Sequence, residues 1–302
     1  MAGVYHIIAK EFRQRSRGLA TLATIFFYSL AMSAVVFITV SIRLSSFQGN
    51  RYQFAEIGRG IAITTYFFQL IISIMLSLSF SASTIASERD QGTFETLNLT
   101  MLSDFEIVAG KLLSSFLYNI VLLISVVPLY MIAFIFGGLE PMLVTSAIAI
   151  LISVTLMVSV LGLLLSLTSN DVRTALGRGF LALIVFGFGT GIFGMMTGYA
   201  VMQTRPEKLL LKILGFFSLL FNPIFPVFDL INGDFTKAIT PEWGSLYHLI
   251  SPYSTFRIEI FGYPIFDPTY TNIAVLSQLW LSILLFSVCL AIYPYYRSRV
   301  IL

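Results

Sequence analysis

Six long apolar stretches without a single charged residue constrain this chain more than any other feature. They lie at about 19–42, 61–86, 112–138, 142–168, 179–201 and 273–293. A helix needs roughly 20 apolar residues to cross a bilayer core, because each residue rises about 1.5 Å. Backbone groups in lipid need internal partners, so such stretches form helices or a closed barrel. Their apolar residues run continuously, without the alternation of a barrel strand. The sequence therefore predicts an all-α polytopic membrane protein with six transmembrane helices.

Composition agrees with a chain that is covered mostly by lipid. Hydrophobic residues make up 57% of it and charged residues 11%, whereas a soluble domain carries about a quarter charged residues. The net charge of +3 is small, which argues against nucleic acid as a partner, because nucleic-acid binding needs a concentrated basic face. Cys289 is the single cysteine, so the chain forms no internal disulfide.

One apolar segment, 213–228, falls short of a seventh span. It is short, Asn222 adds a polar group, and Pro223 and Pro226 interrupt its second half. We interpret it as re-entrant or interfacial; whether residues 213–231 span the membrane stays open. We expect one transmembrane domain over residues 1–302, with an interfacial helix at 1–18, a cytoplasmic loop at 87–111 and an extracytoplasmic segment at 202–272.

Positive charge in the short loops predicts the orientation. Loops on the cytoplasmic side are enriched in Lys and Arg, and six spans place both termini on the same side. With the N-terminus inside, ten basic residues lie in the inner short loops and three in the outer ones. Both termini are therefore predicted to be cytoplasmic. Residues 4–17 are interpreted as an amphipathic helix on the inner membrane surface, with Ile7, Ile8 and Phe12 toward lipid; a plain positively charged anchor for the first span fits equally well.

The apolar stretches contain motifs that favour helix packing over chemistry. Residues 189–194 match the dinucleotide fingerprint G-x-G-x-x-G, but that fingerprint needs a preceding strand, and these residues lie inside a predicted span. Glycines four residues apart instead let a neighbouring helix approach closely. These packing glycines are Gly187, Gly191, Gly194 and Gly198. We expect the buried amides of Gln69, Asn119 and Gln278 to make hydrogen bonds between helices.

No motif for catalysis, metal or cofactor binding is recognisable. Gly110-Lys111 lacks the earlier glycine of a phosphate-binding loop. His6 and His248 are predicted on opposite sides of the membrane, and no Cys/His cluster exists in the sequence. The spans contain no ionisable residue to suggest an ion relay. We therefore expect this chain not to be an enzyme.

The loop at 88–111 is the most informative polar segment. Gly92-Thr93 precedes a short helix with Thr93 as its N-cap, and Phe94 and Leu97 share one face of that helix. Exposed apolar residues there predict a docking site, although an interfacial turn that buries them in headgroups fits equally well. Ser103 and Glu106 have the spacing of a capping box, which starts a second helix leading into the third span.

This loop resembles the coupling region of ABC exporter permeases of the ABC-2 family. The pattern is Glu-Arg-x-x-Gly-Thr-x-Glu-x-Leu, followed by Leu-Ser-x-x-Glu-Ile-x-x-Gly-Lys. The partner-binding residues that the resemblance implies are Glu88, Arg89, Gly92, Thr93, Phe94, Glu95, Thr96, Leu97, Ser103, Glu106, Gly110 and Lys111. The chain departs from the pattern at Phe94, where a smaller aliphatic residue is usual, and at Asn98, which replaces a typical Leu.

The resemblance implies a transporter in which this chain performs no chemistry. A separate ABC ATPase subunit would bind ATP and magnesium, and a coupling helix around 92–99 would carry its motion to the spans. A second permease chain, identical or related, would complete the path through the membrane. The implied location is the plasma membrane of a prokaryote. A scaffold or channel that recruits a cytoplasmic partner through the same loop is the alternative, and the sequence does not identify a substrate.

Overall fold

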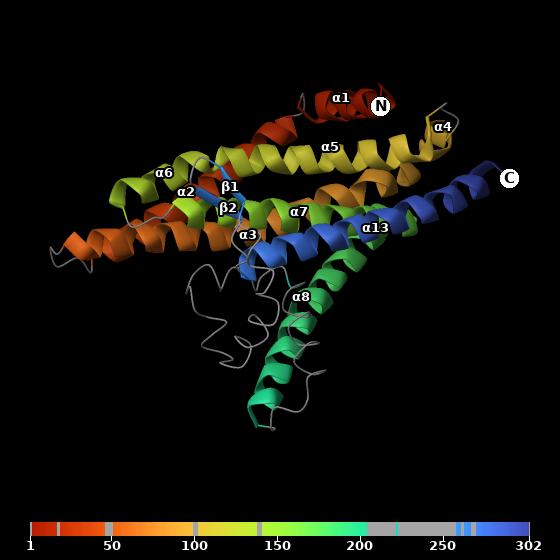
Figure 1. The fold of residues 1–302 in the computed structure, drawn as a ribbon. Coiled ribbons are helices and arrows are strands. Elements are labelled where there is room, and N and C mark those ends of the chain that lie inside the picture. Colours follow the sequence, from red (N-terminus) through yellow and green to blue (C-terminus); the bar gives the residue numbers. More distant parts are fainter. Residues whose placement is uncertain are drawn as a thin grey trace. The chain divides into compact units, whose positions relative to one another are not determined.

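The computed structural model describes residues 2–16, 19–45, 51–98, 102–137, 141–203, 222, 258–260, 263–266 and 270–301. Helices dominate this part of the chain (Figure 1). They are α1 (Ala2–Ser16), α2 (Leu19–Ser45), α3 (Arg51–Asp90), α4 (Phe94–Asn98), α5 (Asp104–Ser125), α6 (Val127–Phe136), α7 (Pro141–Thr168), α8 (Val172–Gln203) and α13 (Tyr270–Ile301). Two short strands, β1 (Ile258–Ile260) and β2 (Tyr263–Phe266), complete the described elements.

Six helical segments of the described residues are long and apolar enough to cross a membrane. They coincide in order with the six predicted stretches, so the prediction of an all-α, six-span protein is confirmed. The third span consists of two helices, because α5 ends at Ser125 and α6 begins at Val127. Pro128 lies in the first turn of α6. A proline has no N–H to continue the helical hydrogen bonds, so it ends one helix and starts the next.

The segment predicted as extracytoplasmic contains an element that the sequence analysis did not foresee. Strands β1 and β2 pair antiparallel, with Ile260 opposite Tyr263 and a shift in register between Ile258 and Glu259. The 213–228 segment lies outside the described residues, apart from Asn222. Its interpretation as re-entrant or interfacial therefore stays a prediction.

The chain divides into two compact units. Unit 1 comprises Met1–Val144, Thr155–Phe180 and Ser282–Leu302, and unit 2 comprises Thr145–Val154 and Leu181–Leu281. Helices α7, α8 and α13 each contribute residues to both units, so each continues without interruption from one unit into the other. The loop at 88–111 lies entirely within unit 1.

Helix α3 is the central element of unit 1. It packs against α2, α5 and α6, while α1 packs along α5. Small residues allow the helices to approach closely, because a Cβ at Gly162 of α7 would collide with the Ser81 hydroxyl, and one at Gly58 would collide with the Gly137 carbonyl.

A buried polar stripe runs along α3 and supplies hydrogen bonds to its neighbours. Its members recur every fourth residue, as one face of a helix requires, and all are almost fully buried: Thr65, Gln69, Ser73, Ser77 and Ser81. The Asn119 amide of α5 donates to the Ser77 hydroxyl. In unit 2, the Ser153 hydroxyl of α7 donates to the Gln278 side chain of α13 at 2.6 Å.

Gln69 of this stripe bridges the two halves of the third span. Its amide oxygen accepts the Tyr130 hydroxyl of α6 at 2.5 Å, and its amide nitrogen lies 3.5 Å from the Leu123 carbonyl of α5. The prediction that Gln69, Asn119 and Gln278 make hydrogen bonds between helices is confirmed.

Candidate functional site

The loop at 88–111 begins with a sharp helix end at Gly92. Gly92 has φ of +68°, a left-handed conformation that favours glycine. Its N–H donates to the Arg89 carbonyl at 3.1 Å, and the Thr93 N–H donates to the Glu88 carbonyl at 2.8 Å. These two bonds form a Schellman motif, which satisfies the last carbonyls of a helix. Gly92 therefore fixes where α3 stops and in which direction the chain leaves it.

The short helix predicted after Thr93 is present as α4. The Thr93 hydroxyl donates to the Glu88 carbonyl at 3.3 Å, which secures the end of α3; the N-cap role predicted for Thr93 stays a prediction. Asn98 ends α4, and the Leu97 side chain lies outside the described residues.

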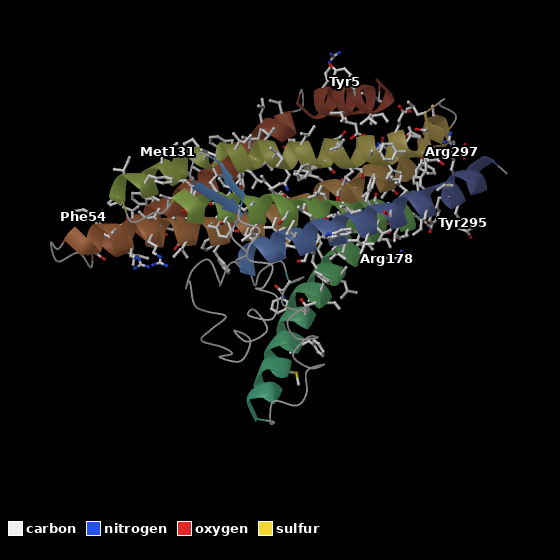
Figure 2. All side chains as sticks on the ribbon, in the orientation of Figure 1. Tyr5, Phe54, Met131, Arg178, Tyr295 and Arg297 are labelled. Carbon is white, nitrogen blue, oxygen red and sulfur yellow. The ribbon has the colours of Figure 1, made fainter. Side chains whose placement is uncertain are left out.

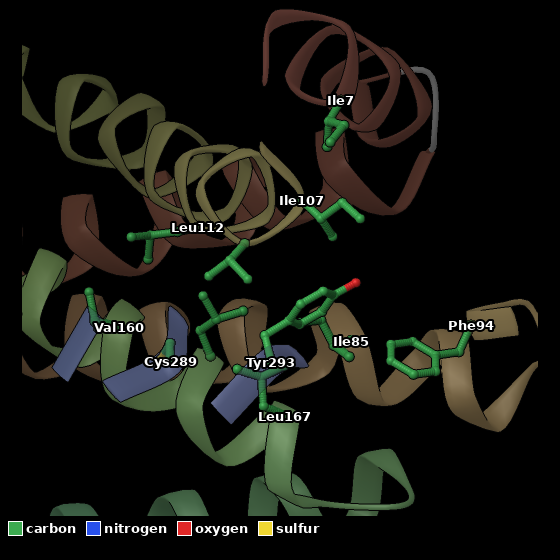
Figure 3. Packing of buried hydrophobic residues seen from close by; sticks show 11 residues of the cluster. Ile7, Ile85, Phe94, Ile107, Leu112, Val160, Leu167, Cys289 and Tyr293 are labelled. Atoms are coloured by element: carbon green, nitrogen blue, oxygen red, sulfur yellow. The ribbon is translucent and has the colours of Figure 1, made fainter. Parts of the chain in front are cut away.

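Phe94 is buried, so the expectation that it forms an exposed docking residue is wrong. Its side chain is 5% exposed and points into an apolar cluster that we call the loop core (Figure 3). The members come from six helices of unit 1: Ile7, Ile85, Phe94, Ile107, Val108, Leu112, Val160, Leu163, Leu167, Cys289 and Tyr293. A helix of five residues is too short to be stable alone, so the burial of Phe94 holds α4 in place.

The exposed residues of α4 whose side chains the structure describes are polar. Glu95 and Thr96 are exposed, as are Gly92 and Thr93 in the turn before them. We call these four residues the polar face. With Phe94 anchored beneath it, the polar face offers a charge and a hydroxyl to a partner on a fixed backbone.

The second half of the loop starts α5 as the sequence predicted. The Ser103 hydroxyl accepts the Glu106 N–H at 3.3 Å, and the Glu106 carboxylate accepts the Ser103 N–H at 3.3 Å. This reciprocal pair is a capping box, and it satisfies two N–H groups at the start of the helix. The predicted capping box is confirmed.

A buried cation ties three helices together behind the loop. Lys111 of α5 is 4% exposed, and its Nζ lies 2.7 Å from the Glu11 carboxylate of α1 and 2.5 Å from the Glu88 carboxylate of α3. Both carboxylates are largely shielded from solvent, with side-chain exposures of 14% and 19%. A buried charge is costly unless it is paired, so this ion triad joins α1 and α3 to α5. The contribution of Glu11 was not foreseen from the sequence.

Helix α1 lies on α5 where Gly110 leaves room for it. A Cβ at Gly110 would come within 2.9 Å of the Ile7 side chain. Ile7 is 9% exposed and belongs to the loop core, so the expectation that Ile7 faces lipid is wrong. The helix predicted at 1–18 is present as Ala2–Ser16; its position on the membrane surface stays a prediction.

A second turn, between α7 and α8, is fastened to the end of α3. The Arg89 guanidinium donates to the Ser169 carbonyl at 2.7 Å, and the Asp90 carboxylate accepts the Val172 N–H at 3.2 Å. This turn was not predicted from the sequence, because it is short and contains no recognisable motif. The start of α3's neighbour α8 is thereby held by a residue of the loop.

Asp171 caps α8 from within the same turn. Its carboxylate accepts the Thr174 N–H at 2.6 Å and the Thr174 hydroxyl at 2.9 Å. These bonds lower the pKa of the Asp171 carboxyl below its usual value, because they stabilise the charged form. The Asp171 carboxylate therefore stays charged to more acidic pH than an ordinary aspartate does.

The side chain of Asn222 forms hydrogen bonds with the glycine-rich part of α8. The Asn222 amide donates to the Gly187 carbonyl at 2.7 Å and to the Thr190 hydroxyl at 2.9 Å, and a Cβ at Gly191 would lie 3.3 Å from that amide. Residues 189–194 lie inside a continuous helix, which is incompatible with a dinucleotide fingerprint. The predicted packing of a neighbouring helix on Gly187, Gly191, Gly194 and Gly198 stays a prediction.

The described residues hold no group of three or more His, Cys, Asp or Glu side chains that could bind a metal. The loop exposes the polar face to solvent. Behind this face, the buried Phe94 and the ion triad connect the loop to the long helices.

A comparison with protein families identifies the group to which this architecture belongs. The family model described as ABC-2 family transporter protein matches residues 5–298, almost the entire chain. The chain belongs to the ABC-2 transporter family. No curated protein matches it. With six helices able to span a membrane among the described residues, this ABC-2 protein is a multi-pass membrane protein and a component of membrane transport.

Proposed function

We propose that this ABC-2 protein is the permease subunit of an ATP-driven exporter. A separate ATPase subunit docks on the polar face, binds ATP with magnesium and hydrolyses it. The observation that carries the proposal is the construction of α4, whose outer face is exposed and polar while Phe94 beneath it is buried among helices of unit 1. A partner that moves α4 must therefore also move the loop core.

Coupling requires that the ATPase binds the polar face with different affinity in two states of the permease, because a ligand shifts an equilibrium only by its differential affinity. Gly92 and Phe94 fix the backbone of α4, so a change in the ATPase reaches α3 and α5 instead of being absorbed in the loop. Glu95 supplies the exposed charge for this contact.

The rest of the proposal follows the family and the sequence. Two permease chains, identical or related, form the path, and both termini and the loop lie in the cytoplasm of a prokaryotic cell. The ion triad and the loop core serve the coupling without touching ATP.

Co-purification from the native host tests the proposal. The tagged full-length chain is extracted in mild detergent, and bound proteins are identified by mass spectrometry. We expect a stoichiometric soluble protein with Walker motifs that is lost from Glu95→Lys and retained by Lys10→Glu, a charge reversal at an exposed position of α1.

Two outcomes would contradict the proposal. If Glu95→Lys retains the ATPase at the native ratio, the polar face is not the docking site. If the native chain purifies without an ATPase, a scaffold or a channel becomes the better description, and conductance of the reconstituted chain alone would indicate the channel.

A further inference from the structure

The end of α13 contacts the loop through a stacked guanidinium. The Arg89 guanidinium carbon lies 4.8 Å from the ring centroid of Phe94 and 4.8 Å from that of Tyr296. A cation within about 6 Å of an aromatic face is attracted by the ring. One ring belongs to α4 and the other to the last turns of α13, so Arg89 joins the helix beneath the polar face to the C-terminal helix.

A second set of contacts holds α13 at the other end of the loop. Arg297 forms an ion pair with Asp104, and its Nη1 lies 3.3 Å from the Leu102 carbonyl. Three turns earlier, the Phe286 ring packs edge to face on Phe105, with centroids 6.1 Å apart. Figure 2 shows Arg297 near the end of α13 where the loop lies.

These contacts lie on both sides of a proline in α13. Pro294 is inside the helix, where it cannot donate the hydrogen bond of a regular turn and crowds the preceding one, so the helix bends most easily there. Phe286 is held before Pro294, and Tyr296 and Arg297 are held after it. The loop thus contacts α13 on both sides of Pro294, where the helix bends most easily.

We propose that the last turns of α13 are part of the coupling device: movement of α4 is passed through the Arg89–Tyr296 stack to the turn of α13 that Pro294 weakens. Pro294 lies in unit 1, and α13 continues without interruption into residues 270–281 of unit 2. Tyr296 and Arg297 act as positioning residues through their contacts with the loop. This inference rests on the proposed function and extends it from the docking face to the C-terminal helix.

Three variants of the full chain, each with the co-purified ATPase, test the proposal in reconstituted vesicles. Tyr296→Leu removes the ring and Tyr296→Phe retains it. Pro294→Ala restores the N–H donor that proline lacks and stiffens this turn of α13. The measurements are the ratio of bound ATPase to permease and the stimulation of ATP hydrolysis by the permease.

We expect Tyr296→Leu to keep the ATPase bound and to lower the stimulation of ATP hydrolysis about fivefold to tenfold, as the strength of a half-buried cation–π contact implies. Tyr296→Phe should retain the stimulation, because phenylalanine keeps the ring that the Arg89 guanidinium contacts. Pro294→Ala should lose stimulation with the ATPase still bound.

The inference would be overturned if Tyr296→Leu stimulated ATP hydrolysis at the native level. If Tyr296→Leu does not fold, native stimulation by Pro294→Ala would overturn it instead. Loss of the bound ATPase in these variants would also overturn it, because Tyr296 would then serve docking. Absence of an ATPase from the native chain would instead refute the proposed function on which the inference rests.

Discussion

At the scale of single residues, Lys111 carries a buried charge in unit 1 that needs its partners to be stable. Its ammonium group is shared by two carboxylates from different helices. Burying an ion pair gains little free energy over an apolar replacement, but removing one partner is strongly unfavourable, because it leaves an uncompensated charge. The ion triad therefore specifies which residue of α1 faces which residue of α3.

We predict that Lys111→Met lowers the free energy of unfolding by about 3–5 kcal/mol, since Glu11 and Glu88 would remain buried without a cation. Thermal unfolding in detergent, followed by intrinsic fluorescence, measures the change. The exposed neighbour on α1, Lys10→Met, is the control and should leave the midpoint unchanged. The triple change Lys111→Met, Glu11→Gln and Glu88→Gln should recover part of the loss; an equal or larger loss in the triple variant would contradict a charge-based role.

At the scale of elements, two helix ends set the geometry of unit 1. Gly92 ends α3 with a left-handed residue, and Pro128 marks the point where the third span divides into the 22-residue α5 and the 10-residue α6. A broken helix leaves backbone groups unpaired inside a membrane, where each costs several kcal/mol. The Gln69 amide lies at this break and contacts both helices, which explains why the polar stripe of α3 carries an amide at this position.

The crossing of α1 over α5 depends on the absence of a side chain at Gly110. We predict that Gly110→Leu displaces α1 and lowers the free energy of unfolding by about 1–3 kcal/mol, the usual cost of overpacking. A disulfide formed between cysteines introduced on α1 and α5 measures the displacement as a lower cross-linking yield.

Gly177→Leu is the matched control, because a Cβ at Gly177 meets nothing within 4 Å. It should leave both the cross-linking yield and the unfolding midpoint unchanged. Native cross-linking in Gly110→Leu would show that α1 tolerates a side chain at the crossing, contrary to the geometry.

At the scale of the whole molecule, the six spans set the sidedness of every loop. We predict that a cysteine at the exposed residue Ser45 reacts with a membrane-impermeant maleimide in intact cells, while one at exposed Asn170 reacts only after the membrane is permeabilised. The native cysteine, Cys289, is buried and is replaced by serine in both variants. Labelling of Asn170→Cys in intact cells would reverse the predicted orientation.

The predictions from sequence were strongest where local physics alone decides. Uncharged apolar runs of sufficient length form helices in lipid because the backbone has no other hydrogen-bond partner. The six spans could therefore be predicted from the sequence. The Ser103–Glu106 capping box is equally local, since its atoms belong to residues three apart. The buried amides were also predictable, because a polar side chain inside an apolar span needs a neighbour.

Burial and partnership around the loop were decided only by the tertiary structure. The sequence places Phe94 on one face of a short helix but does not say what covers that face; packing of helices from distant parts of the chain does. The same holds for Ile7, which faces α5 because Gly110 leaves space there, and for Glu11, whose partner lies 100 residues away. Periodicity fixes which residues share a face, whereas the contact that each face makes depends on helices that only the folded chain brings together.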